Sequence, residues 1–437
     1  MRNTSFGKAD FQFNPVAKIA SCEVKYTWFN YLPVNFPPPT ILGWSRLGSQ
    51  YIMLIRQESV TDKLTLKDLP SASPLPNASL VLVFGSVKRF SEPKLSSFLK
   101  ARYPAAQIVG CTTTGEIGAN SVHDDSLQIT AIFWEKTAQR ATQVKTNGMQ
   151  SSFEAGEQLA RQLKSDSLKA VLAFSDGLNV NGSELLKGFQ SVLGNIPVVG
   201  GMAGDNATFT KTLLMFNDNI SDNLVIAIGL YGNHLVTANG ALGGWKPYGP
   251  PRKITRSVKN VIYELDGKPA LPMYKMYIGE HFAKGLPATG LKFPVAVIGE
   301  GKEVETIRTL AAIDPTNNSL TFFGDVPEGE TIRLCQTNHD RLVEGAAGAA
   351  GMVSGNLTDA NKHGQGLAIC VSCVGRKLVM AEQISDEVQA VHQIFGPQTA
   401  ITGFYSNGEF CPLPNTSDNA LHNQTMTIGY LTEDLFS

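Results

Sequence analysis

The chain has 437 residues, a formal net charge of −1 at pH 7 and 43% hydrophobic residues. Such a composition is typical of a globular protein with room for two domains of ordinary size. The near-zero net charge gives no electrostatic reason to expect nucleic acid or anionic lipid as a partner. No apolar stretch approaches the roughly 20 residues that span a bilayer. We therefore expect a cytoplasmic protein with neither a nucleic-acid nor a membrane partner.

Residues 1–52 differ from the rest of the chain. They include three consecutive prolines at 37–39 and scattered aromatic residues, without a sustained helical or strand period. A new segment opens at Met53. We interpret 1–52 as an irregular extension, with an aromatic arm folded over the main body as the alternative. The expected domains are 53–225 and 226–437.

From residue 80 onward, apolar strand-like runs alternate with amphipathic helix-like runs. Crossover helices dominate early and hairpins follow, which predicts an α/β (mixed α+β) fold of mixed sheets flanked by helices. Residues 241–251 contain glycine, proline and aromatic residues and predict an irregular loop. The pattern predicts strands at 80–85, 127–135, 141–145, 169–174, 212–216, 224–230, 310–314, 320–324 and 367–373, and helices at 92–103, 153–163, 183–193, 268–278, 341–353 and 386–395.

One short phrase occurs near both ends of the chain. Residues 110–117 read GCTTTGEI, and residues 403–410 read GFYSNGEF. Each copy follows a strand-like run and then a helix-like run, and a degenerate third copy, VVGGMAGD, occupies 198–205. Repetition of a turn, rather than of a core, predicts that the turns meet and make a site.

These turns have the chemistry of a small polar ligand site. Glycine allows backbone N–H groups to approach a ligand closely, and the threonine and serine hydroxyls donate or accept hydrogen bonds. Carboxylates come from Glu116, Asp205 and Glu409, and Arg376 is the natural counter-charge that could hold a ligand carboxylate. The set suits an amino-acid-like zwitterion. The alternative is that each Glu accepts hydrogen bonds from its own turn and that Arg376 pairs with one of them.

Catalysis is the weaker interpretation. Cys111 beside Glu116 suggests an amidase-like or hydrolase-like thiol, and Ser175 at a strand end suggests an acyl-transfer site. However, no His has a spacing that predicts a Cys–His pair, and the Gly-x-Ser-x-Gly, P-loop, dinucleotide and His-Glu-x-x-His patterns are absent from the sequence. Cys370 and Cys373 lie in an apolar run that predicts a buried strand rather than a zinc site. We expect no enzyme and no metal site.

The ordered set of these segments resembles the FIST proteins. The resemblance rests on 81–86, 108–117, 174–177, 199–205, 228–232, 244–249, 264–270, 372–376, 403–409 and 421–425, and it covers roughly 78–432. It implies two related, interlocked halves that bind a small ligand at their interface and regulate a separate partner, such as a histidine kinase or a cyclic-di-GMP enzyme. A homo-oligomer is left open.

The turns and the resemblance together define the candidate ligand-binding residues. These are Cys111, Thr112, Thr113, Thr114, Gly115, Glu116, Ser175, Asp176, Gly201, Met202, Asp205, Arg376, Tyr405, Ser406, Gly408, Glu409, His422 and Asn423. One branch of the family, the nitric-oxide-sensing proteins (NosP), binds heme, so a b-type heme is kept as an alternative. Its axial ligand would be His123 or His392, because His422 belongs to the general family motif.

Overall fold

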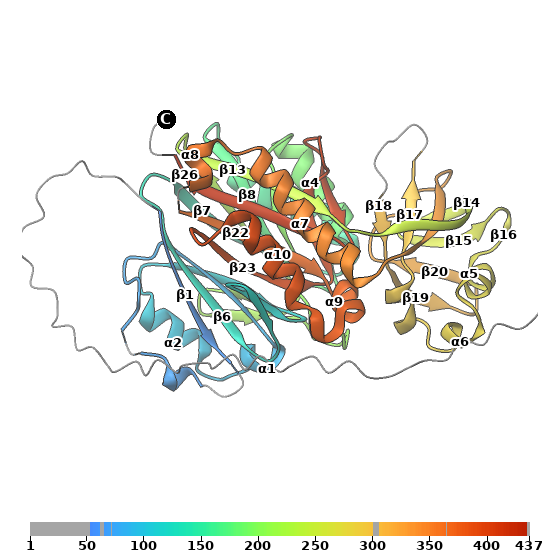
Figure 1. Ribbon diagram of the computed structural model, residues 1–437, viewed down its shortest axis with the longest axis horizontal. Helices are drawn as coiled ribbons and strands as arrows, with labels where there is room; N and C mark the ends of the chain where they lie inside the picture. Colours follow the sequence, from blue (N-terminus) through green and yellow to red (C-terminus); the bar gives the residue numbers. More distant parts are fainter. Residues whose placement is uncertain (1–52, 62–64, 71, 300–305, 364, 435–437) are drawn as a thin grey trace, which may run out of the picture. The chain divides into compact units, whose positions relative to one another are not determined.

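The computed structural model describes residues 53–61, 65–70, 72–299, 306–363 and 365–434. The predicted mixed α/β fold is confirmed, with several mixed sheets flanked by helices (Figure 1). The expectations for residues 1–52 lie outside the described part of the chain. No helix in the described ranges combines the length and the apolar character that a membrane crossing requires.

Three sheets with the same strand plan make up most of the described chain. The first sheet has the order β1 (Leu54–Val60), β6 (Leu127–Phe133), β2 (Leu80–Gly85), β3 (Gln107–Thr112), β10 (Leu214–Phe216), β11 (Asn219–Ser221). The second has β7 (Ala138–Lys145), β12 (Leu224–Tyr231), β8 (Leu168–Ser175), β9 (Val198–Met202), β24 (Gly408–Pro412), β25 (Asn419–His422). The third has β13 (Leu235–Leu242), β26 (Met426–Glu433), β22 (Gly366–Cys373), β23 (Thr399–Ser406), β4 (Glu116–Gly118), β5 (Ser121–His123).

Each of these sheets centres on a parallel strand pair that a helical crossover connects: β2 with β3, β8 with β9, and β22 with β23. One glycine of each pair leaves no room for a side chain. A Cβ added at Gly110, Gly200 or Gly403 would lie 1.9, 2.0 or 1.7 Å from a carbonyl oxygen of the partner strand. Gly200 and Gly403 also have φ values of 137° and 153°, which glycine tolerates. Two of these glycines, Gly110 and Gly403, are the first residues of the two clear copies of the repeated phrase.

The three repeats exchange hairpins. The chain leaves each parallel pair, forms a hairpin on another sheet, and returns to its own sheet as an antiparallel strand. The β4–β5 hairpin that follows β3 pairs with β23, the β24–β25 hairpin that follows β23 pairs with β9, and the β10–β11 hairpin that follows β9 pairs with β3. The two related halves expected from the sequence are therefore three interlocked repeats.

Helices cover the outer faces of the three sheets. Buried residues of α2 (Leu95–Arg102) pack on the first sheet, those of α3 (Ser152–Leu163) and α4 (Gly182–Leu193) on the second, and those of α7 (His339–Gly355) and α10 (Ser385–Phe395) on the third. The helix α7 packs with its backbone close to β13, because a Cβ at Gly240 of β13 would lie 2.1 Å from the Ala349 carbonyl oxygen of α7. Shorter helices are α1 (Val87–Phe90), α8 (Asp359–His363) and α9 (Val374–Met380), with 3-10 turns η1 (Leu66–Asp68), η2 (Met149–Ser151) and η4 (Ala381–Gln383).

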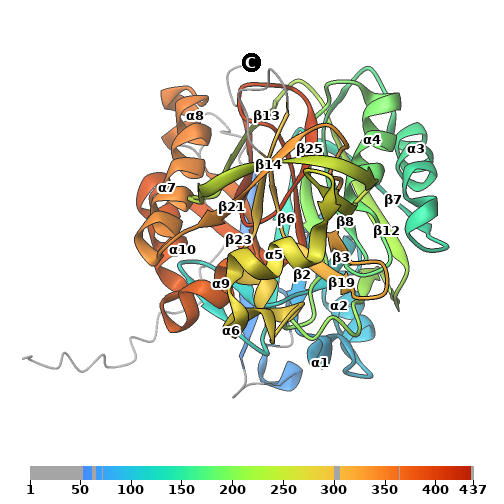
Figure 2. The same ribbon diagram turned by 90° about the vertical axis from the view of Figure 1, so that its right-hand side faces the viewer.

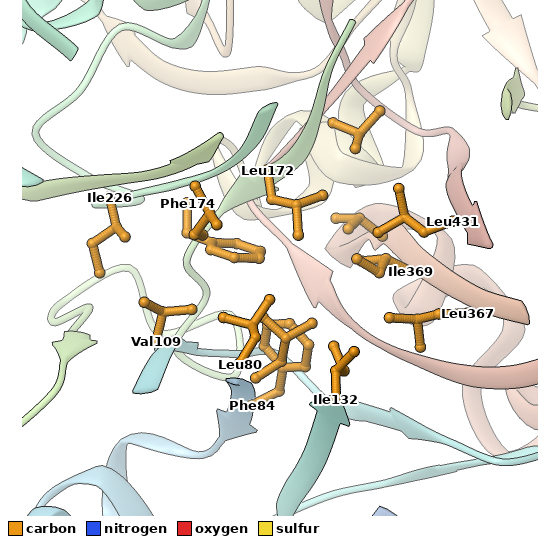
Figure 3. Close-up of a cluster of buried hydrophobic side chains, with 14 of the residues drawn as sticks. Leu80, Phe84, Val109, Ile132, Leu172, Phe174, Ile226, Leu367, Ile369 and Leu431 are labelled. Atoms are coloured by element: carbon orange, nitrogen blue, oxygen red, sulfur yellow. The ribbon is translucent and has the colours of Figure 1, made fainter. Parts of the chain in front are cut away.

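The inner faces of the three sheets share one hydrophobic core. Figure 3 shows Leu80 and Phe84 from the first sheet, Phe174 from the second, and Ile369 and Leu431 from the third, all fully or almost fully buried. Phe84, Phe174 and Phe404 form a ring cluster with centroids 4.8 to 6.1 Å apart. Because every repeat contributes to this core, burial there stabilises all three together.

A fourth sheet is inserted between β13 and α7 (Figure 2). The predicted loop at 241–251 is wrong for residues 241–242, which end β13, and for residues 246–251, which belong to the strand β14. Pro250 and Pro251 fit there because the register with β21 shifts between Tyr248 and Arg252, where ladder donors are not needed. The sheet runs β18 (Thr306–Arg308), β17 (Val295–Ile298), β21 (Thr331–Gln336), β14 (Lys246–Val258), β15 (Val261–Leu265), β20 (Ser319–Phe322), β19 (Leu310–Asp314), with β16 (Lys268–Pro269), α5 (Ala270–Ile278), α6 (Glu280–Ala283) and η3 (Ala288–Lys292) attached.

Candidate functional site

The three glycine-bracketed turns meet at the carboxyl ends of the parallel strands, as the sequence predicts. Each turn is hydrogen-bonded through its backbone to another, so the three form one closed group, which we call the turn junction (112–116, 202–206 and 405–409). The bonds run from Gly204 N to Thr112 O (2.8 Å), from Thr114 N to Tyr405 O (2.8 Å), from Tyr405 N to Gly115 O (2.9 Å) and from Asn407 N to Met202 O (3.3 Å).

Glu116 lies inside the turn junction with its carboxyl group fully engaged. Its side chain is 1% exposed and accepts hydrogen bonds from the Thr113 hydroxyl and from the Ser126 backbone N–H (3.0 Å) and hydroxyl (2.7 Å). Burial raises the pKa of Glu116 to about 7, although these donors oppose the shift. The group therefore titrates near neutral pH.

Glu409 repeats this arrangement in the third repeat. The side chain is completely buried and accepts a hydrogen bond from the Ser406 hydroxyl at 2.7 Å and from the Thr425 N–H at 3.3 Å. Burial raises the pKa of Glu409 to about 8. Both repeated glutamates thus accept hydrogen bonds from their own turns, which was one of the two alternatives that the sequence left open.

The two predicted aspartates hold loops of the second repeat. Asp205 accepts from Thr208 Oγ1 (2.7 Å) and from the N–H groups of Phe209, Thr210 and Lys211. Burial disfavours its charge, yet these donors outweigh burial and lower the pKa of Asp205 below its usual range. The Asp176 carboxylate accepts from the N–H groups of Leu178 and Asn179 (both 2.8 Å) and of Asn223 (3.0 Å).

Arg376 pairs with neither repeated glutamate. Its fully buried guanidinium contacts the fully buried carboxylate of Glu387, and its other donors bind the Gly243 and Leu342 carbonyl oxygens. Glu387 also accepts from the hydroxyl of Tyr405 and from Ser372 at 2.9 Å. Sequence reasoning missed Glu387; the available signal was a carboxylate next to Val388 on the apolar face of the predicted helix at 386–395.

Other predicted residues have structural contacts around the junction. Cys111 lies in the shared hydrophobic core, and burial raises the pKa of its thiol well above the usual value. Thr112 Oγ1 accepts from the Leu213 N–H at 3.0 Å, and the Ser175 hydroxyl donates to the Asp176 carbonyl oxygen at 3.2 Å. Gly201 faces Gly408 so closely that a Cβ on it would lie 2.8 Å from the Gly408 oxygen.

The loop at 421–425 joins the junction to the fourth sheet. His422 donates through Nε2 to the Cys411 carbonyl oxygen at 3.0 Å, and burial lowers its pKa to about 4. From the inserted segment, Thr309 N donates to Asn423 Oδ1 at 3.3 Å. The Gln424 side chain donates in return to the Leu291 carbonyl oxygen at 2.8 Å. Gln424 has φ 60°, a conformation that is uncommon for a residue other than glycine.

A cavity of about 180 Å³ opens beside this loop. Two predicted residues, His422 and Asn423, face it, together with parts of the 241–245 segment, and sequence reasoning did not identify Trp245, Thr306 or Ile307 as neighbours of this site. The lining consists of Ala241, Leu242, Gly243, Gly244, Trp245, Thr306, Ile307, Leu413, Pro414, His422, Asn423 and Thr425.

Several buried polar atoms at the junction and around the loop have no hydrogen-bond partner among the described residues. They are Thr114 Oγ1, Trp245 Nε1, Thr309 Oγ1, Asn407 Oδ1 and Gln424 Oε1. Buried polar groups are normally satisfied, so each exception calls for an explanation such as water or a ligand. Their concentration here, and not only the family resemblance, marks this region as the candidate site.

Two cavities bear on the heme alternative, because a heme needs space for the macrocycle and an axial ligand. The cavity with a histidine in its wall, beside His422, has about 180 Å³, and its imidazole already donates to a carbonyl oxygen. A larger cavity of about 830 Å³ is lined by Thr65, Leu66, Lys67, Leu69, Glu92, Pro93, Lys94, Ser97 and Phe98, none of which is a usual axial ligand. Heme therefore stays a sequence-based prediction, to be tested by an absorbance spectrum.

Two family models match the chain, the FIST N domain over residues 79–268 and the FIST C domain over residues 270–412. The chain belongs to the FIST family. An uncharacterized protein of Methanocaldococcus jannaschii is 21% identical to this FIST protein over an alignment of 337 residues, and the match covers 69% of this chain. The matched part spans 61% of the length of that curated relative.

Two solved structures align with this FIST protein over 87% of its length and 99% of theirs. They are a cyanuric acid hydrolase from A. caulinodans, with a TM-score of 0.35 and 6% identity, and a chorismatase, with a TM-score of 0.32 and 8% identity. At these scores the likeness carries no argument about fold or activity. FIST domains are associated with sensing in signal transduction, which supports a sensor rather than an enzyme.

Proposed function

We propose that this FIST protein is a signal-transduction sensor. A small, amino-acid-like molecule binds in the cavity beside the 421–425 loop, and the response is read by a separate partner such as a histidine kinase or a cyclic-di-GMP enzyme. The proposal is supported by membership of a family associated with sensing and by the unpartnered polar atoms around the cavity.

One observation carries the proposal: the loop that lines the cavity is bonded on two sides. Toward the turn junction, Thr425 N donates to the Glu409 carboxyl group at 3.3 Å. Toward the inserted fourth sheet, Asn423 accepts from Thr309 N at 3.3 Å, and Arg308 donates to the Leu421 carbonyl oxygen at 3.0 Å. A ligand seated against the loop therefore contacts the connection between the three-repeat body and the insertion.

The expected mechanism is a shift in how the fourth sheet sits on the body. Exchanged hairpins and a shared core hold the three repeats together, whereas the insertion leaves β13 and returns at α7. A ligand shifts such an equilibrium only by its difference in affinity for the two arrangements. The 421–425 loop can make the ligand affinity differ between the two arrangements, because the contacts of this loop with the insertion lie beside the ligand cavity.

The first test is a thermal-shift screen of amino acids and related small molecules, followed by hydrogen exchange with each ligand found. We expect slower exchange at 421–425 and at 306–310. Asn423→Ala removes a side chain that lines the cavity and accepts from Thr309, so it should weaken the ligand at least tenfold. Asn147→Ala, at an exposed site on the second repeat, is the matched control. A ligand that leaves exchange at 421–425 unchanged would contradict the proposal.

A further inference from the structure

We propose that the cavity beside Trp245 and the 421–425 loop binds the carboxylate of a small anionic molecule, and that Arg308 supplies the charge that selects it. This inference rests on the proposed function and adds to it the charge of the ligand and the residue that reads it. From the sequence, Arg376 was the expected partner of a ligand carboxylate, but its donors are taken by Glu387 and two backbone carbonyl groups.

Arg308 has a buried guanidinium group that forms no ion pair with any described residue. The residue is 8% exposed, and its guanidinium donates to three backbone carbonyl oxygens, those of Asp325 (2.9 Å), Ile307 (3.0 Å) and Leu421 (3.0 Å). In the described ranges, the other buried arginines each form an ion pair: Arg89 with Glu92, Arg102 with Glu58, and Arg376 with Glu387. Burial lowers the pKa of Arg308 to about 10, and the charges of Asp325 and Glu330, neither of which forms an ion pair with it, oppose this shift only in part. A buried charge without a direct anionic partner is costly, and a bound anion would compensate it.

The position of Arg308 connects this charge to the cavity. Ile307, the preceding residue, lines the cavity, and Arg308 Nη1 donates to the carbonyl oxygen of Leu421, which precedes the cavity residue His422. The charge of Arg308 acts on the His422 imidazole, where it adds to burial in lowering the histidine pKa. Among the described residues that line the cavity, none is an aspartate or a glutamate. Arg308 is not itself one of the lining residues, so its charge acts on an entering carboxylate from behind the wall rather than by direct contact.

The second observation is a buried donor at the cavity wall. Trp245 Nε1 has no partner among the described residues, and an indole N–H can only donate. The indole edge borders Gly243, because a Cβ there would lie 3.3 Å from Trp245 Cδ1 and 3.8 Å from Thr425 Oγ1. All three residues line the cavity. The missing partner of Trp245 must therefore be an acceptor.

A carboxylate satisfies both observations. Its negative charge is attracted by the guanidinium group of Arg308, and one of its two oxygens can accept a hydrogen bond from the indole N–H of Trp245. Thr309 Oγ1, 1% exposed and without a partner in the described ranges, is a further donor next to Arg308. A cavity of about 180 Å³ holds roughly six waters at the ~30 Å³ each occupies in the liquid. The ligand is therefore a small acid.

The test compares acids with their own amides. Acetate, lactate, succinate and benzoate are titrated into the full chain at pH 7 and constant ionic strength, alongside acetamide, lactamide, succinamide and benzamide. At least one acid should bind one to one, with its amide at least tenfold weaker. Arg308→Gln should lose that acid at least tenfold, and Trp245→Phe should weaken it several-fold. Arg256→Gln, whose side chain is 52% exposed, is the matched control and should leave binding unchanged.

Equal binding of acid and amide would overturn the inference, and so would tight binding of the acid by Arg308→Gln. If Arg308→Gln does not fold, two milder variants replace it: Arg308→Lys keeps the positive charge, and Trp245→Phe removes only the indole donor. In that case, unchanged binding of the acid by Trp245→Phe overturns the inference. A neutral or cationic ligand that protects the 421–425 loop would overturn this inference while sustaining the sensor. A metabolite screen without any ligand would overturn both.

Discussion

Replacement of Glu409 by glutamine should make the protein more stable at alkaline pH. The glutamine has nearly the same shape, its amide group can donate to the Ser406 hydroxyl, and its oxygen can still accept from the Thr425 N–H. What the substitution removes is a buried group that can ionise. The folded-state pKa of Glu409 is raised to about 8 from a reference of 4.5.

The sign and size of the effect follow from proton linkage. Between pH 4.5 and about 8, the folded state keeps a proton on Glu409 that the unfolded chain has released, so the free energy of unfolding falls as pH rises through that window. At about 1.4 kcal/mol per pKa unit, the full loss above pH 8 is roughly 5 kcal/mol, of which about 3 kcal/mol falls between pH 5.5 and 9. Glutamine does not titrate and escapes this loss.

The assay is urea unfolding of both proteins at pH 5.5, 7 and 9, with the difference in unfolding free energy taken at each pH. That difference should grow in favour of Glu409→Gln by about 3 kcal/mol across the series. Glu280→Gln makes the same chemical change on a side chain that is 88% exposed, and it should stay within about 0.5 kcal/mol of the native protein. A difference that does not vary with pH would show that Glu409 is already ionised in the folded protein, and the reasoning would fail.

Three further substitutions test the junction. Glu116→Gln should show the same pH trend with a smaller gain, about 2 kcal/mol between pH 5.5 and 9, because the pKa of Glu116 is raised only to about 7. Gly403→Ala should lower the free energy of unfolding by more than about 3 kcal/mol or prevent folding, because its Cβ would lie 1.7 Å from a backbone oxygen. The control Gly351→Ala has open space in a helix and should raise the free energy of unfolding by up to about 1 kcal/mol. Equal melting temperatures for the two variants would refute the close-packing argument. Glu387→Ala leaves the buried Arg376 charge unpaired and should cost about 3–5 kcal/mol in chemical denaturation, and a loss below 1 kcal/mol would contradict the buried pair.

The sequence predicted several of the long strands and six of the helices, because hydrophobic period is a local property. The strand predicted at 80–85 is β2 (Leu80–Gly85), and the helix predicted at 183–193 corresponds to α4 (Gly182–Leu193). The loop prediction failed at 246–251, where the glycines and prolines lie in a strand with an irregular register. Local composition cannot show that a neighbouring strand leaves those positions without a ladder bond.

The candidate site was predictable only in part. Repetition of the phrases around Glu116 and Glu409 was enough to predict that the turns meet, because equivalent turns end equivalent strands. The partners of the charged groups could not be predicted from the sequence, because the contacts of Arg376 with Glu387 and of Arg308 with Leu421 are set by the tertiary fold. The ligand-binding role of the site residues stays a prediction.

The exchange of hairpins has a consequence for how this protein can be divided. The hairpin of each repeat pairs with a strand of a second repeat, and the sheet of each repeat is extended by the hairpin of the third. No repeat therefore has a complete sheet without the other two. A cut between the two FIST models, near residue 269, would strip β24 and β25 from β9 and leave that strand as a bare edge, open to pairing with other chains. We therefore expect that neither of the segments matched by the two family models folds when it is produced without the other.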